Sequence, residues 1–217
     1  MTRSFRLRIW RVVAVLVSLG LLLVGCGRSS NPITLTGETM GTYWTVRLAA
    51  LPPSQSLAGL RGQINRVLAN INDEMSTYRA DSVISQFNRA GVNGRVDLPD
   101  GFSQVLTEAL YWAEESGGAF DPTAGPLVNL WGFGPAGRVE QPPTQADIDA
   151  ARQYVGWQKI DFDRASQTLR QPGGFYLDLS AIAKGWGVDK VTEHLIRAGV
   201  EGFLVDIGGE LRAALPR

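Results

Sequence analysis

Residues Gly173–Gly209 carry the pattern that decides the fold: GGFYLDLSAIAKGWGVDKVTEHLIRAGVEGFLVDIGG. The run Phe175–Leu179 predicts an apolar strand, and a Ser-Ala-Ile-Ala turn follows it. A helix is predicted to open at Lys184 and to end at Gly199, because glycine commonly ends helices. A second apolar strand, Gly202–Ile207, then runs into a glycine pair. Corners of this strand–helix–strand kind bind ligands in α/β proteins, since helix N-termini favour anions and glycine allows close backbone approach.

Outside this stretch, strands and helices mix without strict alternation. Residues 33–48 carry strand signals around Gly41, and residues 43–48 alternate polar and apolar side chains, which predicts a half-buried strand. Helices are predicted over residues 57–75 (capped by Ser54 or Ser56), 82–88 (capped by Asp81), 100–116 (capped by Asp100), 126–131 and 144–154 (capped by Thr144), with a hairpin over 159–170 and a strand over 210–212. The pattern indicates an α+β fold, in which helices flank a mostly antiparallel sheet.

The first residues have the features of a bacterial lipoprotein signal. Four arginines precede the apolar run Val12–Val24, which is too short for a comfortable membrane span of about 20 residues. Small residues then lead to Cys26. We therefore expect a signal peptide over residues 1–25, a tether over 26–32 that begins at a lipidated Cys26, and a domain over 33–217. An ordinary secretory peptide with a chance cysteine, or an uncleaved anchor, is the alternative.

This leader predicts a lipid-anchored protein on the periplasmic side of a bacterial cell envelope. Gly27, rather than Asp, follows the cysteine, which favours the outer over the inner membrane. With one cysteine the chain has no intramolecular disulfide, and a formal net charge of zero does not support nucleic-acid binding. The sequence contains neither a Cys/His metal cluster nor a Walker or dinucleotide glycine motif.

Five short motifs, in order along the chain, together resemble those of the ApbE family, the FAD:protein FMN transferases. They are ETMGT at 38–42, MSTY at 75–78, AFDPT at 119–123, LWGFG at 130–134 and DLSAIAKG at 178–185. The resemblance runs from about Thr36 to the end of the chain, and it implies the ApbE-like version of the α+β fold.

The resemblance implies an enzyme that uses FAD and a divalent cation, usually Mg²⁺. Such an enzyme breaks the pyrophosphate of FAD and joins FMN by a phosphoester bond to a threonine, or sometimes serine, hydroxyl of a target protein. The implied acceptors are flavoprotein subunits of ion-translocating redox complexes, and the implied membrane contact is the lipid anchor. A FAD pyrophosphatase that releases FMN and AMP, or a non-enzymatic flavin-binding lipoprotein, is the alternative.

The resemblance also assigns binding residues, while no catalytic residue is assigned. It implies FAD contacts at Met40, Tyr78, Ala119, Phe120, Asp121, Asp178 and Lys184, and a metal ligand at the Ala181 carbonyl oxygen. Each side chain has a plainer interpretation. Met40 and Tyr78 could fill a core, and Lys184 could be a surface lysine. Asp121 could fix a turn, and Asp178 could cap the turn that follows it.

The family pattern continues beyond Arg217, where it supplies a histidine near FAD and an aspartate and a threonine for the metal. A magnesium ion prefers near-octahedral oxygen coordination, which one carbonyl cannot provide. We therefore expect the fold to be incomplete at its C-terminus and this chain alone to have little or no transferase activity.

Overall fold

The computed structural model describes residues 32–215. The predicted signal peptide, Cys26 and nearly all of the tether lie outside the described residues. The chain divides into a unit that ends at Pro32 and a unit over Ile33–Arg217, and only the second is described below. Within residues 32–215, no helix is both long enough and apolar enough to cross a membrane.

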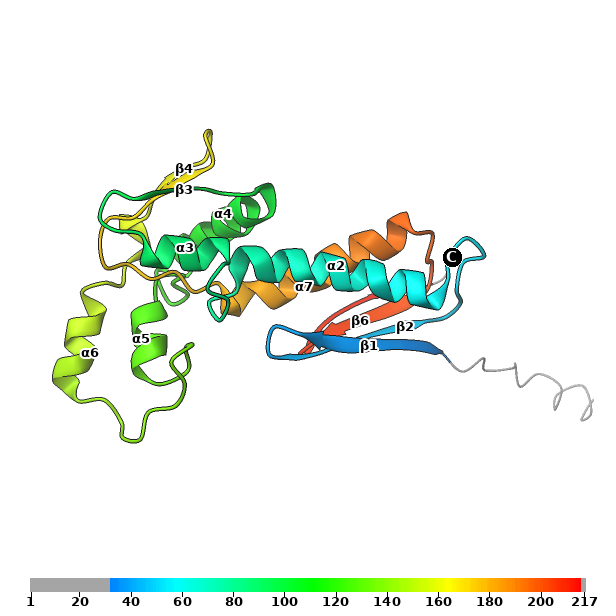
Figure 1. The fold of residues 1–217 in the computed structure, drawn as a ribbon, viewed down its shortest axis with the longest axis horizontal. Helices are drawn as coiled ribbons and strands as arrows, with labels where there is room; N and C mark the ends of the chain where they lie inside the picture. Colours follow the sequence, from blue (N-terminus) through cyan, green and yellow to red (C-terminus); the bar gives the residue numbers. More distant parts are fainter. Residues whose placement is uncertain (1–31, 216–217) are drawn as a thin grey trace, which may run out of the picture. The chain divides into compact units, whose positions relative to one another are not determined.

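A four-stranded antiparallel sheet, in the order β1-β2-β6-β7, forms one part of this unit (Figure 1). The strands are β1 (Ile33–Thr39), β2 (Thr42–Leu48), β6 (Phe203–Ile207) and β7 (Glu210–Ala214). The alternation predicted for β2 is confirmed, because Trp44, Val46 and Leu48 are buried on one face. Gly37, opposite Trp44 on β1, gives the indole room, since a Cβ there would lie 2.4 Å from Trp44 Nε1.

Two long helices, α2 (Leu57–Met75) and α7 (Ser180–Arg197), lie side by side over the buried face of this sheet (Figure 1). The predicted cap of α2 is confirmed at Ser56, whose hydroxyl accepts the Gly59 N–H at 3.1 Å. Leu60, Ile64 and Leu68 of α2 belong to the core between helices and sheet, together with Val188, Val191 and Leu195 of α7.

A second core lies at the other ends of the same two helices. Ile71 and Met75 of α2 and Ala183 of α7 pack there against α4 and its neighbours. The surrounding elements are α3 (Val83–Arg89), β3 (Arg95–Asp97), α4 (Asp100–Glu115), α5 (Gly125–Leu130), α6 (Gln145–Arg152), a 3₁₀ turn (Trp157–Lys159), β4 (Asp161–Asp163) and β5 (Thr168–Arg170). Strands β3, β5 and β4 form a separate antiparallel sheet. The predicted α+β class with antiparallel pairing is thus confirmed.

The predicted strand over Phe175–Leu179 is wrong, because side chains rather than a neighbouring strand take up its backbone hydrogen bonds. The amide of Asn88 pairs with both the N–H and the carbonyl of Leu177. The buried amide of Gln171 does the same for Phe175. The segment is extended and buried, yet it joins neither sheet.

Helix α7 begins at Ser180, one turn before the predicted start at Lys184. The Asp178 carboxylate accepts the Ser180 N–H at 2.8 Å and closes the turn that starts the helix. The plainer interpretation of Asp178, as the residue that fixes this turn, therefore describes its contact in the structure.

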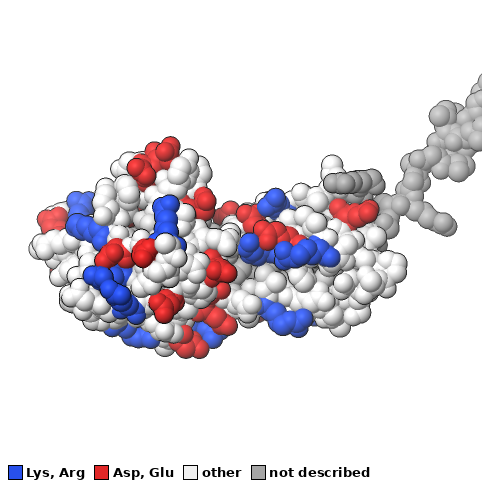
Figure 2. All heavy atoms as spheres, turned by 90° about the horizontal axis from the view of Figure 1, so that it is seen from above, with Lys and Arg blue, Asp and Glu red and all other residues white. Residues whose placement is uncertain are grey.

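Smaller differences concern caps and one strand. Ser82, not Asp81, caps α3, and Asp100 lies inside α4 rather than at its cap. The strand Arg95–Asp97 was not predicted. The predicted cap of α6 at Thr144 is confirmed, and Thr144 and Asp147 form a capping box in which each side chain hydrogen-bonds the other's backbone. On the face shown in Figure 2, acidic and basic side chains are interspersed rather than gathered by sign.

Candidate functional site

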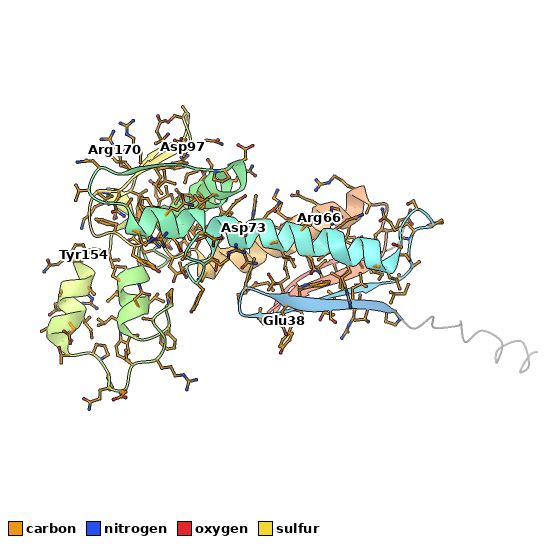
Figure 3. The ribbon with its side chains drawn as sticks, viewed as in Figure 1. Glu38, Arg66, Asp73, Asp97, Tyr154 and Arg170 are labelled. Atoms are coloured by element: carbon orange, nitrogen blue, oxygen red, sulfur yellow. The ribbon has the colours of Figure 1, made fainter. Side chains whose placement is uncertain are left out.

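A cavity of about 590 Å³ opens where the turn between β1 and β2, the end of α2 and the first turns of α7 meet. Its lining includes Met40, Asn72, Met75, Tyr78, Ser180 and Lys184. In Figure 3 the labels on Glu38 and Asp73 locate two of these elements, because Glu38 precedes the turn on β1 and Asp73 follows Asn72 on α2. The cavity therefore joins three of the predicted binding residues from three distant parts of the chain.

The turn between β1 and β2 presents Met40 to this cavity. Met40 and Gly41 have φ values of 49° and 69°, so both residues of the two-residue turn are left-handed. This conformation is common for Gly and unusual for Met, because a Cβ crowds the following carbonyl. The Met40 side chain packs against both cores. Gly187 of α7 leaves room for it, since a Cβ there would lie 3.4 Å from the Met40 methyl group.

Ser180 and Lys184, one helical turn apart on α7, supply the wall of the cavity formed by this helix. The stem of Lys184 runs past the turn between β6 and β7. A Cβ added to Gly208 in this turn would lie 3.4 Å from the Lys184 Cδ. No carboxylate within residues 32–215 forms an ion pair with Lys184. The ammonium group is thus available for a ligand anion.

Tyr78 lines the cavity as an exposed ring that is held at its far end. Its hydroxyl donates a hydrogen bond of 2.8 Å to the carbonyl of Phe133. The loop that carries Phe133 is tightly closed, because a Cβ on Gly134 would lie only 1.7 Å from Asn129 Oδ1. The plainer interpretation of Tyr78 as a core residue does not hold, since 67% of the residue is exposed.

The stretch Ala119–Asp121 does not line the cavity, and its carboxylate has structural partners. Asp121 accepts hydrogen bonds from the backbone N–H and the hydroxyl of Thr123 and from the Trp157 N–H. The Thr123 hydroxyl is fully buried and accepts the Gly156 N–H at 2.7 Å. Ala119 is exposed, and Phe120 packs against the second core. This side-chain network fixes the loop.

The Ala119–Asp121 loop is nevertheless tied to the start of α7. The Asp178 N–H donates to the carbonyl of Pro122 at 2.9 Å. Tyr176, two residues earlier, lies against Gly125, where a Cβ would be 2.3 Å from its ring. Burial raises the pKa of the Tyr176 phenol, which stays protonated at neutral pH. Asp178 itself is half-buried beside the cavity rather than in its lining.

The described residues do not fit a complete magnesium site. Within residues 32–215 there is no group of three or more His, Cys, Asp or Glu side chains that could hold a metal ion. Ala181 is exposed in the first turn of α7, so its carbonyl is one oxygen donor at most. A near-octahedral magnesium ion requires several more.

Asn72 and Ser180 are among the lining residues that sequence reasoning missed. Asn72 lies next to Ile71 on the buried side of α2. A polar amide at the edge of an apolar helix face was the sequence feature that could have identified it as a lining residue. Ser180 was placed in a turn, whereas the helix in fact starts there and turns it toward the cavity.

Comparisons with known proteins agree on one family. The model of the ApbE family matches residues 40–215. The chain is 39% identical over 192 residues to the FAD:protein FMN transferase of Vibrio cholerae serotype O1, a match that covers 88% of this chain and 57% of the relative. It is 38% identical over 205 residues to the FAD:protein FMN transferase of Haemophilus influenzae, covering 92% and 59%.

Solved structures give the same result. The flavin transferase ApbE from Vibrio cholerae superposes with a TM-score of 0.81 at 38% identity, covering 84% of this chain and 59% of that one. The apo flavinyl transferase ApbE of Pseudomonas stutzeri gives 0.78 at 36% identity, covering 85% and 61%. The chain thus spans somewhat less than two thirds of the length of these relatives.

Proposed function

The chain belongs to the ApbE family, and from this premise we propose that it serves the transfer of FMN from FAD to a threonine or serine hydroxyl of a target protein. The observation that carries the proposal is the cavity, which joins Met40, Tyr78 and Lys184 from three separate segments. Its volume of about 590 Å³ lies within the usual range for small-molecule sites.

The lining of the cavity suits the two chemical halves of the ligand. Met40, Met75 and the ring of Tyr78 offer apolar and aromatic surface for a flat ring system. Lys184 offers a positive charge for the pyrophosphate. Phosphoryl transfer depends mainly on positioning and on neutralising charge, and these residues supply both.

In the proposed reaction, the acceptor hydroxyl oxygen attacks the phosphorus atom of the FMN half of FAD. A new oxygen–phosphorus bond forms, the pyrophosphate bond to AMP breaks, and AMP leaves with the electron pair. The hydroxyl proton passes to a base, and no described residue is assigned that role. Lys184 stabilises the negative charge that develops on the bridging oxygen and on the departing phosphate.

Metal dependence is part of the proposal, although residues 32–215 hold no group of three or more His, Cys, Asp or Glu side chains that could bind a metal ion. Mg²⁺ would neutralise phosphate charge, with the Ala181 carbonyl as a ligand. Removal of the metal by EDTA is expected to abolish transfer, and added Mg²⁺ to restore it.

The proposed setting follows from the leader. Lipidation at Cys26 would hold the enzyme at the periplasmic side of a bacterial membrane, with the outer membrane favoured over the inner. Acceptors there would be flavoprotein subunits of ion-translocating redox complexes. Mass spectrometry of the N-terminal peptide from membranes tests the anchor directly.

Transfer is tested by incubating the chain with FAD, Mg²⁺ and an apo acceptor subunit. Covalent flavin fluorescence on a denaturing gel, with one AMP released per flavin attached, is expected from a competent enzyme. AMP release without attachment would favour a pyrophosphatase, and FAD binding without AMP would favour a flavin-binding lipoprotein.

The Lys184 contribution has a matched control on the same helix. Lys184→Met keeps the apolar stem and removes the charge, so weaker FAD binding is expected. Lys190→Met also removes one charge from α7, but Lys190 lies outside the cavity lining and over the Trp186 ring. Equal losses in the two variants would contradict the role of Lys184.

A further inference from the structure

Asn72 is the amide side chain in the cavity lining, and its hydrogen bonds use only one end of the amide. Its Nδ2 donates to Thr39 Oγ1 at 3.0 Å and to the Leu68 carbonyl at 2.8 Å. Because a carbonyl oxygen can only accept, the nitrogen must be the atom that faces Leu68. The orientation of the Asn72 amide is therefore fixed by its neighbours.

The other end of the amide, Oδ1, is left as an acceptor. No donor among residues 32–215 hydrogen-bonds to it, whereas both bonds of the side chain are made by Nδ2. Oδ1 is also absent from the buried polar atoms without partners in this part of the chain, so the atom is accessible. The cavity that Asn72 lines is otherwise lined largely by apolar side chains, among them Met40, Ile71 and Met75.

An isoalloxazine ring matches this arrangement. Its oxidised form is a flat, largely apolar system with one ring N–H, at N3, and that donor needs an acceptor when it leaves water. A few fixed polar groups in an otherwise apolar pocket commonly set the orientation of a ligand.

We propose that Asn72 orients the flavin, with its Oδ1 accepting the N3–H of the isoalloxazine ring. The inference rests on the proposed function, since it assumes that a flavin enters this cavity. N3 belongs to the pyrimidine ring and the ribityl chain leaves from N10 of the central ring, so the two groups point in different directions. With N3 anchored on α2, the ribityl phosphate can extend toward Lys184, on the other helix that lines the cavity.

The test compares lumiflavin with 3-methyl-lumiflavin, which differs only by a methyl group in place of the N3 hydrogen. Dissociation constants are measured by calorimetry on the full 217-residue chain in mild detergent, with a detergent-only blank. Methylation removes one hydrogen bond and leaves Oδ1 unpaired, so the wild-type protein is expected to bind 3-methyl-lumiflavin about tenfold more weakly.

Two variants separate direct recognition from support of the fold. Asn72→Leu keeps the approximate shape without the acceptor, and its preference for lumiflavin is expected to fall below about twofold. Thr39→Val removes the partner of Nδ2 and keeps Asn72, so it is expected to weaken both ligands alike and to retain the tenfold ratio. Circular dichroism checks that each variant is folded.

Two results would overturn the inference without touching the proposed function. One is equal binding of the two flavins by the wild-type protein, which needs no variant to be informative. The other is a preference for lumiflavin that survives in folded Asn72→Leu. Failure of the wild type to bind either flavin would overturn the flavin cavity itself, and with it the proposed function.

Discussion

Gln171 offers the sharpest test of how the segment before α7 is held. The residue is 1% exposed, and its amide makes four hydrogen bonds to backbone groups. Two go from Nε2 to the carbonyls of Phe87 and Phe175, and two come to Oε1 from the N–H groups of Gly173 and Phe175. Gln171→Met keeps the length of the side chain and removes all four bonds.

The expected loss follows from these four bonds. A neutral hydrogen bond contributes a net stabilisation of about 1 kcal/mol, so Gln171→Met is expected to lower the free energy of unfolding by about 4 kcal/mol. For a domain of this size, that corresponds to a fall in Tm of roughly 8–16 °C. The backbone groups left behind are buried, and water therefore replaces the lost bonds poorly.

Urea unfolding followed by tryptophan fluorescence measures this change. Gln158→Met is the matched control, because Gln158 is exposed and its side chain makes no hydrogen bond within residues 32–215; its effect is expected to stay within about 0.5 kcal/mol. A Gln171→Met variant that unfolds within about 1 kcal/mol of the wild type would refute the reasoning that side-chain amides hold this segment.

Three further substitutions test other contacts. Burial raises the pKa of the Glu74 carboxyl, so the free energy of unfolding falls as pH rises from about 4.3, the pKa of an unperturbed Glu, through the higher pKa of the folded chain. In urea titrations, Glu74→Gln is therefore expected to be more stable than the wild type at pH 7 and equally stable near pH 4. Gly134→Ala drives a Cβ into Asn129 and is expected to lower stability by about 1–3 kcal/mol, whereas Gly185→Ala, with open space around it, is expected to be neutral or stabilising. Thr123→Val removes a buried hydroxyl that both donates and accepts a hydrogen bond, and a loss of about 1–3 kcal/mol is expected, with Thr123→Ser as the control that retains it.

Local sequence patterns correctly predicted helices and strands that have a strong hydrophobic periodicity or that are fixed by hydrogen bonds between residues close in sequence. The alternation in Thr42–Leu48 predicted the buried face of β2, and the helix predicted over residues 57–75 has the bounds of α2. Thr144 was predicted as the cap of α6, and its hydrogen bonds with Asp147 mark the start of this helix. In each case the determining contacts lie within one element, so they are visible in the local sequence.

The segment Phe175–Leu179 shows where such patterns stop. An apolar run is compatible with a strand and with any extended buried segment, and the difference lies in what pairs with the backbone. One of its partners, Asn88, stands 89 residues away from Leu177, and no local pattern reports a pairing at that separation. The cavity also depends on contacts between residues far apart in sequence, because only the folded chain brings Met40 close to Lys184.

At Met40, the residue that would give the most stable turn differs from the residue that contributes a side chain to the cavity. A non-glycine residue held there costs on the order of 1 kcal/mol, and Asn or Gly would relieve most of that strain. Selection for heat resistance alone would therefore favour exchange of Met40. The exchange would also remove an apolar side chain from the cavity, so protein engineers who seek a more robust version should gain stability elsewhere and leave this turn unchanged.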